Sequence, residues 1–143
     1  MDAKRYLKQI GKLEEMIRQR EEQIEQIRTE AASIRAVSYD KPVVQSSSGN
    51  DGTINLISYL VELGKELDSI KLDYYQTKDR IITEIQMMEK PEYMTLLHKR
   101  YIERKSFELI SVEMNYAYQS VVNMHKAALD DFEKMISEYK KVC

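Results

Sequence analysis

The chain has 143 residues, 43% apolar and 32% charged, with 22 Lys and Arg against 24 Asp and Glu. Its net charge of −2 excludes a strongly basic nucleic-acid coat and an acidic disordered tail, and four Gly and two Pro are too few turn-formers for a many-stranded sheet. A composition rich in Glu, Lys, Ile, Met and Gln is typical of long exposed helices, so we expect an all-α fold.

The first predicted element is a long helix over residues 3–34. Its apolar residues return every three or four positions: Tyr6, Ile10, Leu13, Ile17, Ile24, Ile27, Ala31 and Ile34. Nearly all intervening residues are charged or Gln, so the apolar stripe is a narrow coiled-coil-like seam. Because helical stability comes mostly from packing an apolar face, this helix needs a partner.

A flexible connection is predicted next, over residues 38–52. It contains Pro42 and a run of Ser, Gly, Asn and Asp without an apolar residue from position 46 to position 52. Asp51 and Thr53 are candidate N-caps of the following helix.

The second long helix is predicted over about residues 54–88, and Pro91 favours a new helix after it. Its apolar stripe consists of Ile54, Ile57, Leu60, Val61, Leu67, Tyr74, Ile81, Ile85 and Met88. We expect residues 1–90 to form an antiparallel hairpin in which this stripe covers the first one. Pairing between two chains, a homodimer through the long helices, is the alternative, and the pattern alone does not choose between them.

The last third, residues 91–143, is predicted to hold shorter helices over about 91–103, 106–114 and 118–139. Ser106 is a plausible N-cap, and Asn115 suits the left-handed conformation of a short turn. Two helices joined by three or four residues, the second one longer, indicate a helix-turn-helix module. Its expected core is apolar and spaced for two facing helices: Ile110, Met114, Val121, Met124, Ala128 and Leu129.

The residues of this module carry a family resemblance. Leu96-Leu97, Arg100-Tyr101-Ile102, the stretch from Ser106 to Tyr116, and the segment from Val121 to Leu129 together resemble sigma-factor region 4. More closely, residues 94–129 resemble the phage late-transcription regulators of the ArpU/RinA type. The whole chain shares their layout of a helical N-terminal half, a Ser- and Gly-rich loop and a C-terminal helix-turn-helix.

The resemblance implies a DNA-reading surface on the second helix of the module. It implies base contacts in the major groove by Tyr118, Gln119, Val122 and Asn123. It implies phosphate contacts by Lys99, Arg100, Arg104, Lys105, Ser106 and Lys126. Gln and Asn bond adenine and Val contacts the thymine methyl, so an A/T-leaning site is expected.

Four positions depart from the family pattern. Asn115 stands where the family usually has Gly, and Ala117 replaces the Ser or Thr that would cap the recognition helix. Ser111 stands for the usual Ala, and Arg104 occupies a position that is often Gly. The base-reading positions lack the Arg that the family commonly places there.

Residues 93–129 hold five Lys and Arg against three Glu, a local charge of +2. Because counterion release supplies much of the affinity for DNA, one copy should bind weakly and need a second copy or host RNA polymerase. We therefore expect a phage-type transcription regulator, a late-gene activator, that binds double-stranded promoter DNA. The alternative is a helical protein–protein adaptor or inhibitor that keeps the fold without sequence-specific DNA binding.

Other functional signals are missing from the sequence. His98 and His125 are the only histidines, no Cys or His cluster has metal-ligand spacing, and no Gly-rich loop has the residues that hold a phosphate, so we expect no enzyme, metal or cofactor. No apolar run reaches the roughly 18 residues of a membrane span, the N-terminus lacks a signal-peptide pattern, and Cys143 is the only cysteine. These features predict no membrane partner and a location in the cytoplasm of a bacterial host cell.

Overall fold

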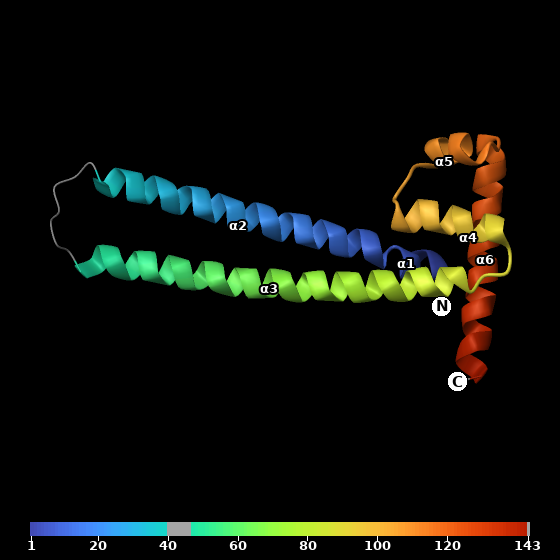
Figure 1. Ribbon diagram of the computed structural model, residues 1–143, viewed down its shortest axis with the longest axis horizontal. Helices are drawn as coiled ribbons and strands as arrows, with labels where there is room; N and C mark the ends of the chain where they lie inside the picture. Colours follow the sequence, from blue (N-terminus) through green and yellow to red (C-terminus); the bar gives the residue numbers. More distant parts are fainter. Residues whose placement is uncertain (40–46, 143) are drawn as a thin grey trace. The chain divides into compact units, whose positions relative to one another are not determined.

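The computed structural model describes residues 1–39 and 47–142, and within those ranges its regular structure is entirely helical. In chain order the helices are α1 (Ala3–Leu7), α2 (Gln9–Tyr39), α3 (Ser47–Gln86), α4 (Pro91–Leu97), the π-helical turn η1 (His98–Ile102), α5 (Phe107–Met114) and α6 (Tyr118–Val142) (Figure 1). The predicted all-α class is confirmed.

The predicted connection is shorter than expected at both ends. Residues 38 and 39 belong to α2, and residues 47–52 already belong to α3, while residues 40–46 lie outside the described residues. The predicted start of the second helix near residue 54 is therefore wrong. Once a helix exists, extending it costs only the intrinsic propensity of each residue, about 1 kcal/mol even for Gly, so α3 extends through Gly49 and Gly52.

Two compact units make up the chain. One contains Glu14–Asp73 and is called the hairpin unit below; the other contains Met1–Leu13 and Tyr74–Cys143 and is called the terminal unit. This division differs from the predicted boundary at residue 90. The first residues of the chain and the last turns of α3 share a core with the C-terminal helices, which places them in the terminal unit.

In the hairpin unit, α2 and α3 pack on each other as an antiparallel pair (Figure 1). Ile24 of the predicted first stripe is buried with Leu63 and Leu67 of α3, and Ile17, Ile27 and Leu60 pack around them. Ile17, Ile24 and Ile27 of the first stripe are thus covered by α3 of the same chain. Two exposed ion pairs cross the same contact, Arg20 to Glu66 at 3.6 Å and Lys71 to Glu21 at 3.5 Å; at such exposure each contributes little stability.

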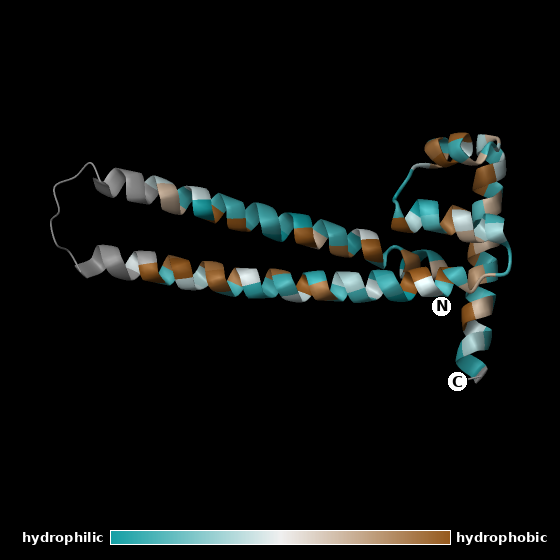
Figure 2. Cartoon of the chain, in the orientation of Figure 1, coloured by the Kyte–Doolittle hydropathy of each residue, from teal (hydrophilic) through white to brown (hydrophobic). Residues whose placement is uncertain are grey.

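The predicted stripe of α3 needs correction in its first half. Leu60 and Leu67 face α2, together with Leu63, which the prediction missed. Ile54, Ile57 and Val61 are instead 60%, 46% and 53% exposed. Successive helical residues are rotated by about 100°, so Val61 lies on a different side of α3 from Leu60 and Leu63. The hydropathy colouring in Figure 2 shows hydrophobic residues recurring along this part of α3.

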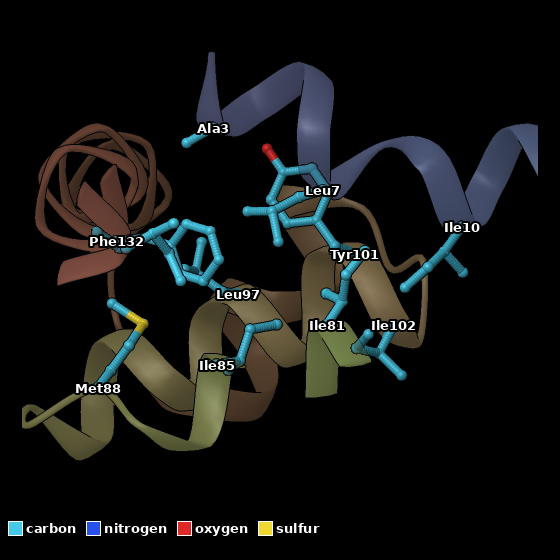
Figure 3. Packing of buried hydrophobic residues seen from close by; sticks show 12 residues of the cluster. Ala3, Leu7, Ile10, Ile81, Ile85, Met88, Leu97, Tyr101, Ile102 and Phe132 are labelled. Carbon is cyan, nitrogen blue, oxygen red and sulfur yellow. The ribbon is translucent and has the colours of Figure 1, made fainter. Parts of the chain in front are cut away.

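The terminal unit is built around one large apolar core. Leu7, Ile81, Ile85, Leu97 and Phe132 are almost completely buried, and they come from α1, α3, α4 and α6. Figure 3 shows Leu7 and Tyr101 near the centre of this cluster, with Phe132 reaching in from α6. The core therefore fixes α6, the longest helix of this unit, against the beginning of the chain.

Candidate nucleic-acid interface

A three-residue connection joins α5 to α6. Ser106 caps α5, with its hydroxyl accepting a hydrogen bond from the Leu109 N–H at 3.2 Å. Asn115 ends the helix in the left-handed conformation, with φ 59° and ψ 40°. The N–H groups of Asn115 and Tyr116 then donate to the carbonyls of Val112 and Ser111, at 3.3 and 3.0 Å, as in a Schellman motif. Both predicted cap residues are confirmed.

A second apolar cluster holds α4, α5 and α6 together. Leu96, Ile110 and Val121 are fully buried in it, and Phe107, Met114 and Met124 are packed around them. Four predicted core residues are thus found in this cluster: Ile110, Met114, Val121 and Met124. The other two, Ala128 and Leu129, pack in the larger core instead because α6 continues past α5. The result is a helix-turn-helix whose second helix is held from two sides.

His125 of α6 is buried, with 7% of its surface exposed. Its Nε2 lies 2.7 Å from the Tyr101 hydroxyl, and its ring packs on the edge of the Phe107 ring, centroid to centroid 4.9 Å. Burial, then the nearby Arg100, Lys4 and Lys8, lowers the pKa of His125 to about 4. The ring is neutral at physiological pH, and its hydrogen bond to Tyr101 and its contact with Phe107 hold α6 in place.

The predicted base-contacting residues lie on the first turns of α6. Tyr118, Gln119 and Asn123 are exposed, and Val122 is half-buried. The Gln119 amide Nε2 donates to Asn123 Oδ1 at 3.2 Å, so the two amides are held side by side on one helix face. Opposite them, Val121 anchors the helix in the core. This arrangement presents two amide side chains to the outside on a fixed helix.

Two of the predicted phosphate-contacting lysines already form ion pairs within the protein, which the sequence does not reveal. Lys99 and Lys105 both bind the Glu113 carboxylate, at 3.3 and 2.8 Å, and Lys105 also binds Glu103 at 2.6 Å. Hydrogen bonding to Lys105 lowers the pKa of both carboxyl groups. These four residues therefore form a network without net charge.

The remaining predicted phosphate contacts are spread over the unit. Arg100 donates to the Lys105 carbonyl at 3.0 Å, and its guanidinium lies 4.0 Å from the Phe107 ring centroid. The Ser106 hydroxyl is used as the cap of α5, although its position at that helix start remains exposed. Lys126 is exposed on α6, and Arg104 lies beside Gly11 of α2. Folding thus places Arg104 beside a residue that is about 90 positions earlier in the chain.

Within the described residues, no group of three or more His, Cys, Asp or Glu residues has the geometry to hold a metal ion. Over the same ranges, no helix combines the length and apolar character that crossing a bilayer requires.

Comparisons with known proteins returned no match among family models, curated proteins or solved structures. The likeness to phage late-transcription regulators therefore rests on the motif residues named above.

Proposed function

We propose that this chain is a DNA-binding transcription regulator of the phage late-gene type, which inserts the first turns of α6 into the major groove. The observation that carries the proposal is the exposed Gln119–Asn123 pair on a helix that Val121 anchors in the core. A recognition helix needs this combination, because base readout requires side chains held in a fixed register.

The chemistry of this face favours A/T base pairs. An Asn or Gln amide donates to adenine N7 and accepts from adenine N6, and each such bidentate contact contributes about 1–3 kcal/mol of discrimination. The half-exposed Val122 supplies an apolar contact for a thymine methyl, and the exposed Tyr118 lies at the start of the same helix. The face has no Arg, whose preferred partner is guanine.

A single copy of the chain is expected to bind DNA weakly. With Lys99 and Lys105 bound to Glu113, few cations remain for phosphate contacts near α6. Since phosphate contacts dominate DNA affinity, we infer that a second copy of the chain, and host RNA polymerase at the promoter, complete the complex.

A surface for a second copy is present on the outer side of α3. Ile54, Ile57, Val61 and Leu72 are 46–60% exposed. Exposed apolar residues that recur on one side of a helix are typical of protein contacts.

The spacing on this face is symmetric, which favours a self-complementary antiparallel contact. The midpoint of the face lies between Gly64 and Lys65. Ile57 and Leu72 lie at equal distances on either side of it, seven residues from Gly64 and from Lys65 respectively. Val61 and Asp68 are likewise each three residues from Gly64 and from Lys65. Two antiparallel copies would pair Ile57 with Leu72 and Val61 with Asp68, and Lys65 would lie one helical turn from the Asp68 of the second copy. A parallel pair would instead place Asp68 opposite Asp68, which is repulsive.

Selection from a pool of random duplexes tests the proposal. The purified full chain is expected to enrich an A/T-leaning sequence at low salt, and the Asn123→Ala variant is expected to lose that enrichment while melting at the wild-type temperature. A folded wild-type protein that enriches no sequence over the input pool would contradict it.

The Glu113 network favours a second candidate, an adaptor that keeps this fold without DNA readout. Carboxylates that neutralise Lys99 and Lys105 suit a protein partner better than a phosphate backbone. In this case Gln119→Ala and Asn123→Ala would leave activity in the host unchanged, whereas a charge placed on the outer face of α3 would abolish it.

A further inference from the structure

A polar pair is buried where η1 meets α6. Tyr101 is 6% exposed and His125 is 7% exposed, and the Tyr101 Oη atom lies 2.7 Å from His125 Nε2. The two rings are stacked, with centroids 5.7 Å apart. Over the described ranges, Thr77 and His125 are the only polar residues, apart from tyrosine, that are buried. A hydrogen bond inside such an apolar unit therefore needs an explanation.

Stability alone does not explain the pair. Two apolar side chains of the same shape are often as stabilising in a core as a buried hydrogen-bonded pair. A hydrogen bond differs from an apolar contact in being directional, because it weakens steeply when the donor and the acceptor are misaligned. Such a bond fixes the relative position of the two elements that it joins, here η1 and α6.

The tyrosine is placed by an unusual turn. η1 is π-helical: the Glu103 N–H donates to the His98 carbonyl, five residues earlier, at 3.1 Å. A π-helical turn contains an extra residue and therefore rotates the chain after it relative to a regular α-helix. Tyr101 and Ile102 are both buried in this turn. Such turns are rare and frequently lie at functional sites, which favours a role of Tyr101 beyond packing.

His125 lies behind the predicted reading face of α6. Asn123 and His125 are two residues apart, which corresponds to about 200° of rotation and about 3 Å along the helix axis. The imidazole is therefore on the side of α6 opposite Asn123, whose Oδ1 accepts from Gln119 Nε2 at 3.2 Å. The Phe107 ring lies T-shaped to the same imidazole, with centroids 4.9 Å apart. A rotation or shift of α6 at His125 would thus displace both amide groups.

We propose that Tyr101 is a positioning residue for DNA readout: its hydrogen bond to His125 sets the rotation and the axial position of α6, and through them the place of the two amide side chains in the major groove. The inference rests on the proposed function of α6. Val121 also anchors this helix, but its contacts are apolar and tolerate small shifts that a directional bond does not. A side chain that reads a base has to be held within about 0.5 Å of its productive position.

The pair is expected to control the preference between sequences and not the general affinity for DNA, because phosphate contacts carry no sequence information. Two variants separate positioning from stability. Tyr101→Phe keeps the ring and removes the hydroxyl, which leaves a buried imidazole nitrogen without its partner and lowers the melting temperature. Tyr101→Phe combined with His125→Leu removes both polar groups, so this double variant is expected to melt near the wild-type temperature. Tyr93→Phe is the control, because Tyr93 is a partly buried tyrosine that packs on the core of the same unit.

The first measurement is the ratio of dissociation constants for a selected duplex and its shuffled version. Tyr101→Phe is expected to lower the wild-type preference at least about fivefold, the equivalent of a weak bidentate base contact, and to leave the affinity for the shuffled duplex nearly unchanged. The double variant is expected to keep the low preference although its stability is restored. A preference that returns together with the melting temperature would overturn the proposal, because the pair would then act through stability alone.

The second measurement needs no DNA. Residual dipolar couplings of the backbone N–H groups of residues 119–125 report the direction of α6 relative to α4 and α5. Both Tyr101 variants are expected to depart from the wild-type couplings, and Tyr93→Phe is expected to keep them. If the folded wild type prefers no duplex, the proposed function fails, and these couplings alone decide the role of the pair. Wild-type couplings in both Tyr101 variants would overturn that role.

Discussion

At the scale of single residues, the sequence predicts helix caps but not the ion pairs that form between elements. Ser106 and Asn115 are recognisable from sequence because a cap depends on the residue itself and its immediate neighbours. The pairing of Lys99 and Lys105 with Glu113 depends on how η1 and α5 pack, which no local pattern reveals. The phosphate contacts that the family resemblance implies therefore carry no information on which of these cations are already paired.

His125 makes stability depend on pH in a defined window. Its pKa is about 4 in the folded protein against 6.5 for an unperturbed histidine, so the unfolded chain binds the proton more readily. Unfolding free energy is expected to fall as pH drops from about 6.5 to about 4, by roughly 2–3 kcal/mol from this group. Denaturant unfolding at several pH values measures it, with His125→Gln expected to flatten the dependence over this window.

His98→Gln is the matched control for that experiment, because His98 is only partly buried and lies beside Glu103. It should leave the wild-type pH dependence largely intact. A wild-type unfolding free energy that stays constant between pH 6.5 and 4 would disprove the assigned role of His125.

Glu113 is expected to weaken DNA binding. Glu113→Gln removes the carboxylate that holds Lys99 and Lys105; Lys99 becomes available to phosphates, while Lys105 stays paired with Glu103. Tighter binding to duplex DNA at low salt is expected, with a salt slope steeper by roughly 1. Fluorescence anisotropy measures both quantities. The exposed Glu138→Gln on α6 serves as control, and equal effects of the two variants would show that only net charge matters.

At the scale of elements, helix type is predictable and the buried face is less so. The stripe predicted along α3 combines residues of two faces, because Leu60 and Val61 are adjacent in sequence and about 100° apart around the helix. Only the packed structure shows that Leu63 and Leu67 face α2 while Ile54, Ile57 and Val61 remain exposed. When apolar residues lie on two faces of a helix, as in α3, the sequence pattern alone does not show which face is buried.

The exposed face of α3 predicts a dimer that a single charge disrupts. Val61→Glu places a carboxylate in the centre of that face, opposite Asp68 of the second copy, and should shift the chain to monomer. Sedimentation over a range of concentrations detects the change. Ser69→Glu, exposed on the same helix and outside the face, should keep the wild-type association. A wild-type chain that stays monomeric up to high micromolar concentration would eliminate this contact.

At the scale of the whole molecule, the division into units was not predictable. The seam of residues 3–34 reads as one continuous helix, yet Ala3, Leu7 and Ile10 belong to the core of the terminal unit, and Ile24 belongs to the hairpin unit. Periodicity predicts that a helix buries an apolar stripe but not which distant segment covers it. The same limit applies to Tyr101 and His125, which meet only in the folded chain.

The shared core predicts that the start of the chain stabilises the terminal unit. Leu7 is fully buried against residues of α3, α4 and α6, so Leu7→Ala should cost about 2–5 kcal/mol of unfolding free energy. Leu72→Ala, at a position that is 59% exposed, should change it by less than about 1 kcal/mol. Equal, small effects of the two substitutions in thermal or denaturant unfolding would contradict the assignment of Leu7 to this core.

The central claim is that the first turns of α6 read DNA sequence, and the ratio of dissociation constants for a selected duplex and its shuffled version tests it most directly. The wild type is expected to prefer the selected duplex. Asn123→Ala should lower that preference by about 5- to 150-fold, the equivalent of one bidentate base contact of 1–3 kcal/mol. Gln76→Ala, on the exposed surface of α3, should leave it unchanged. A ratio near one for the folded wild type, or a ratio that Asn123→Ala does not alter, would contradict the claim.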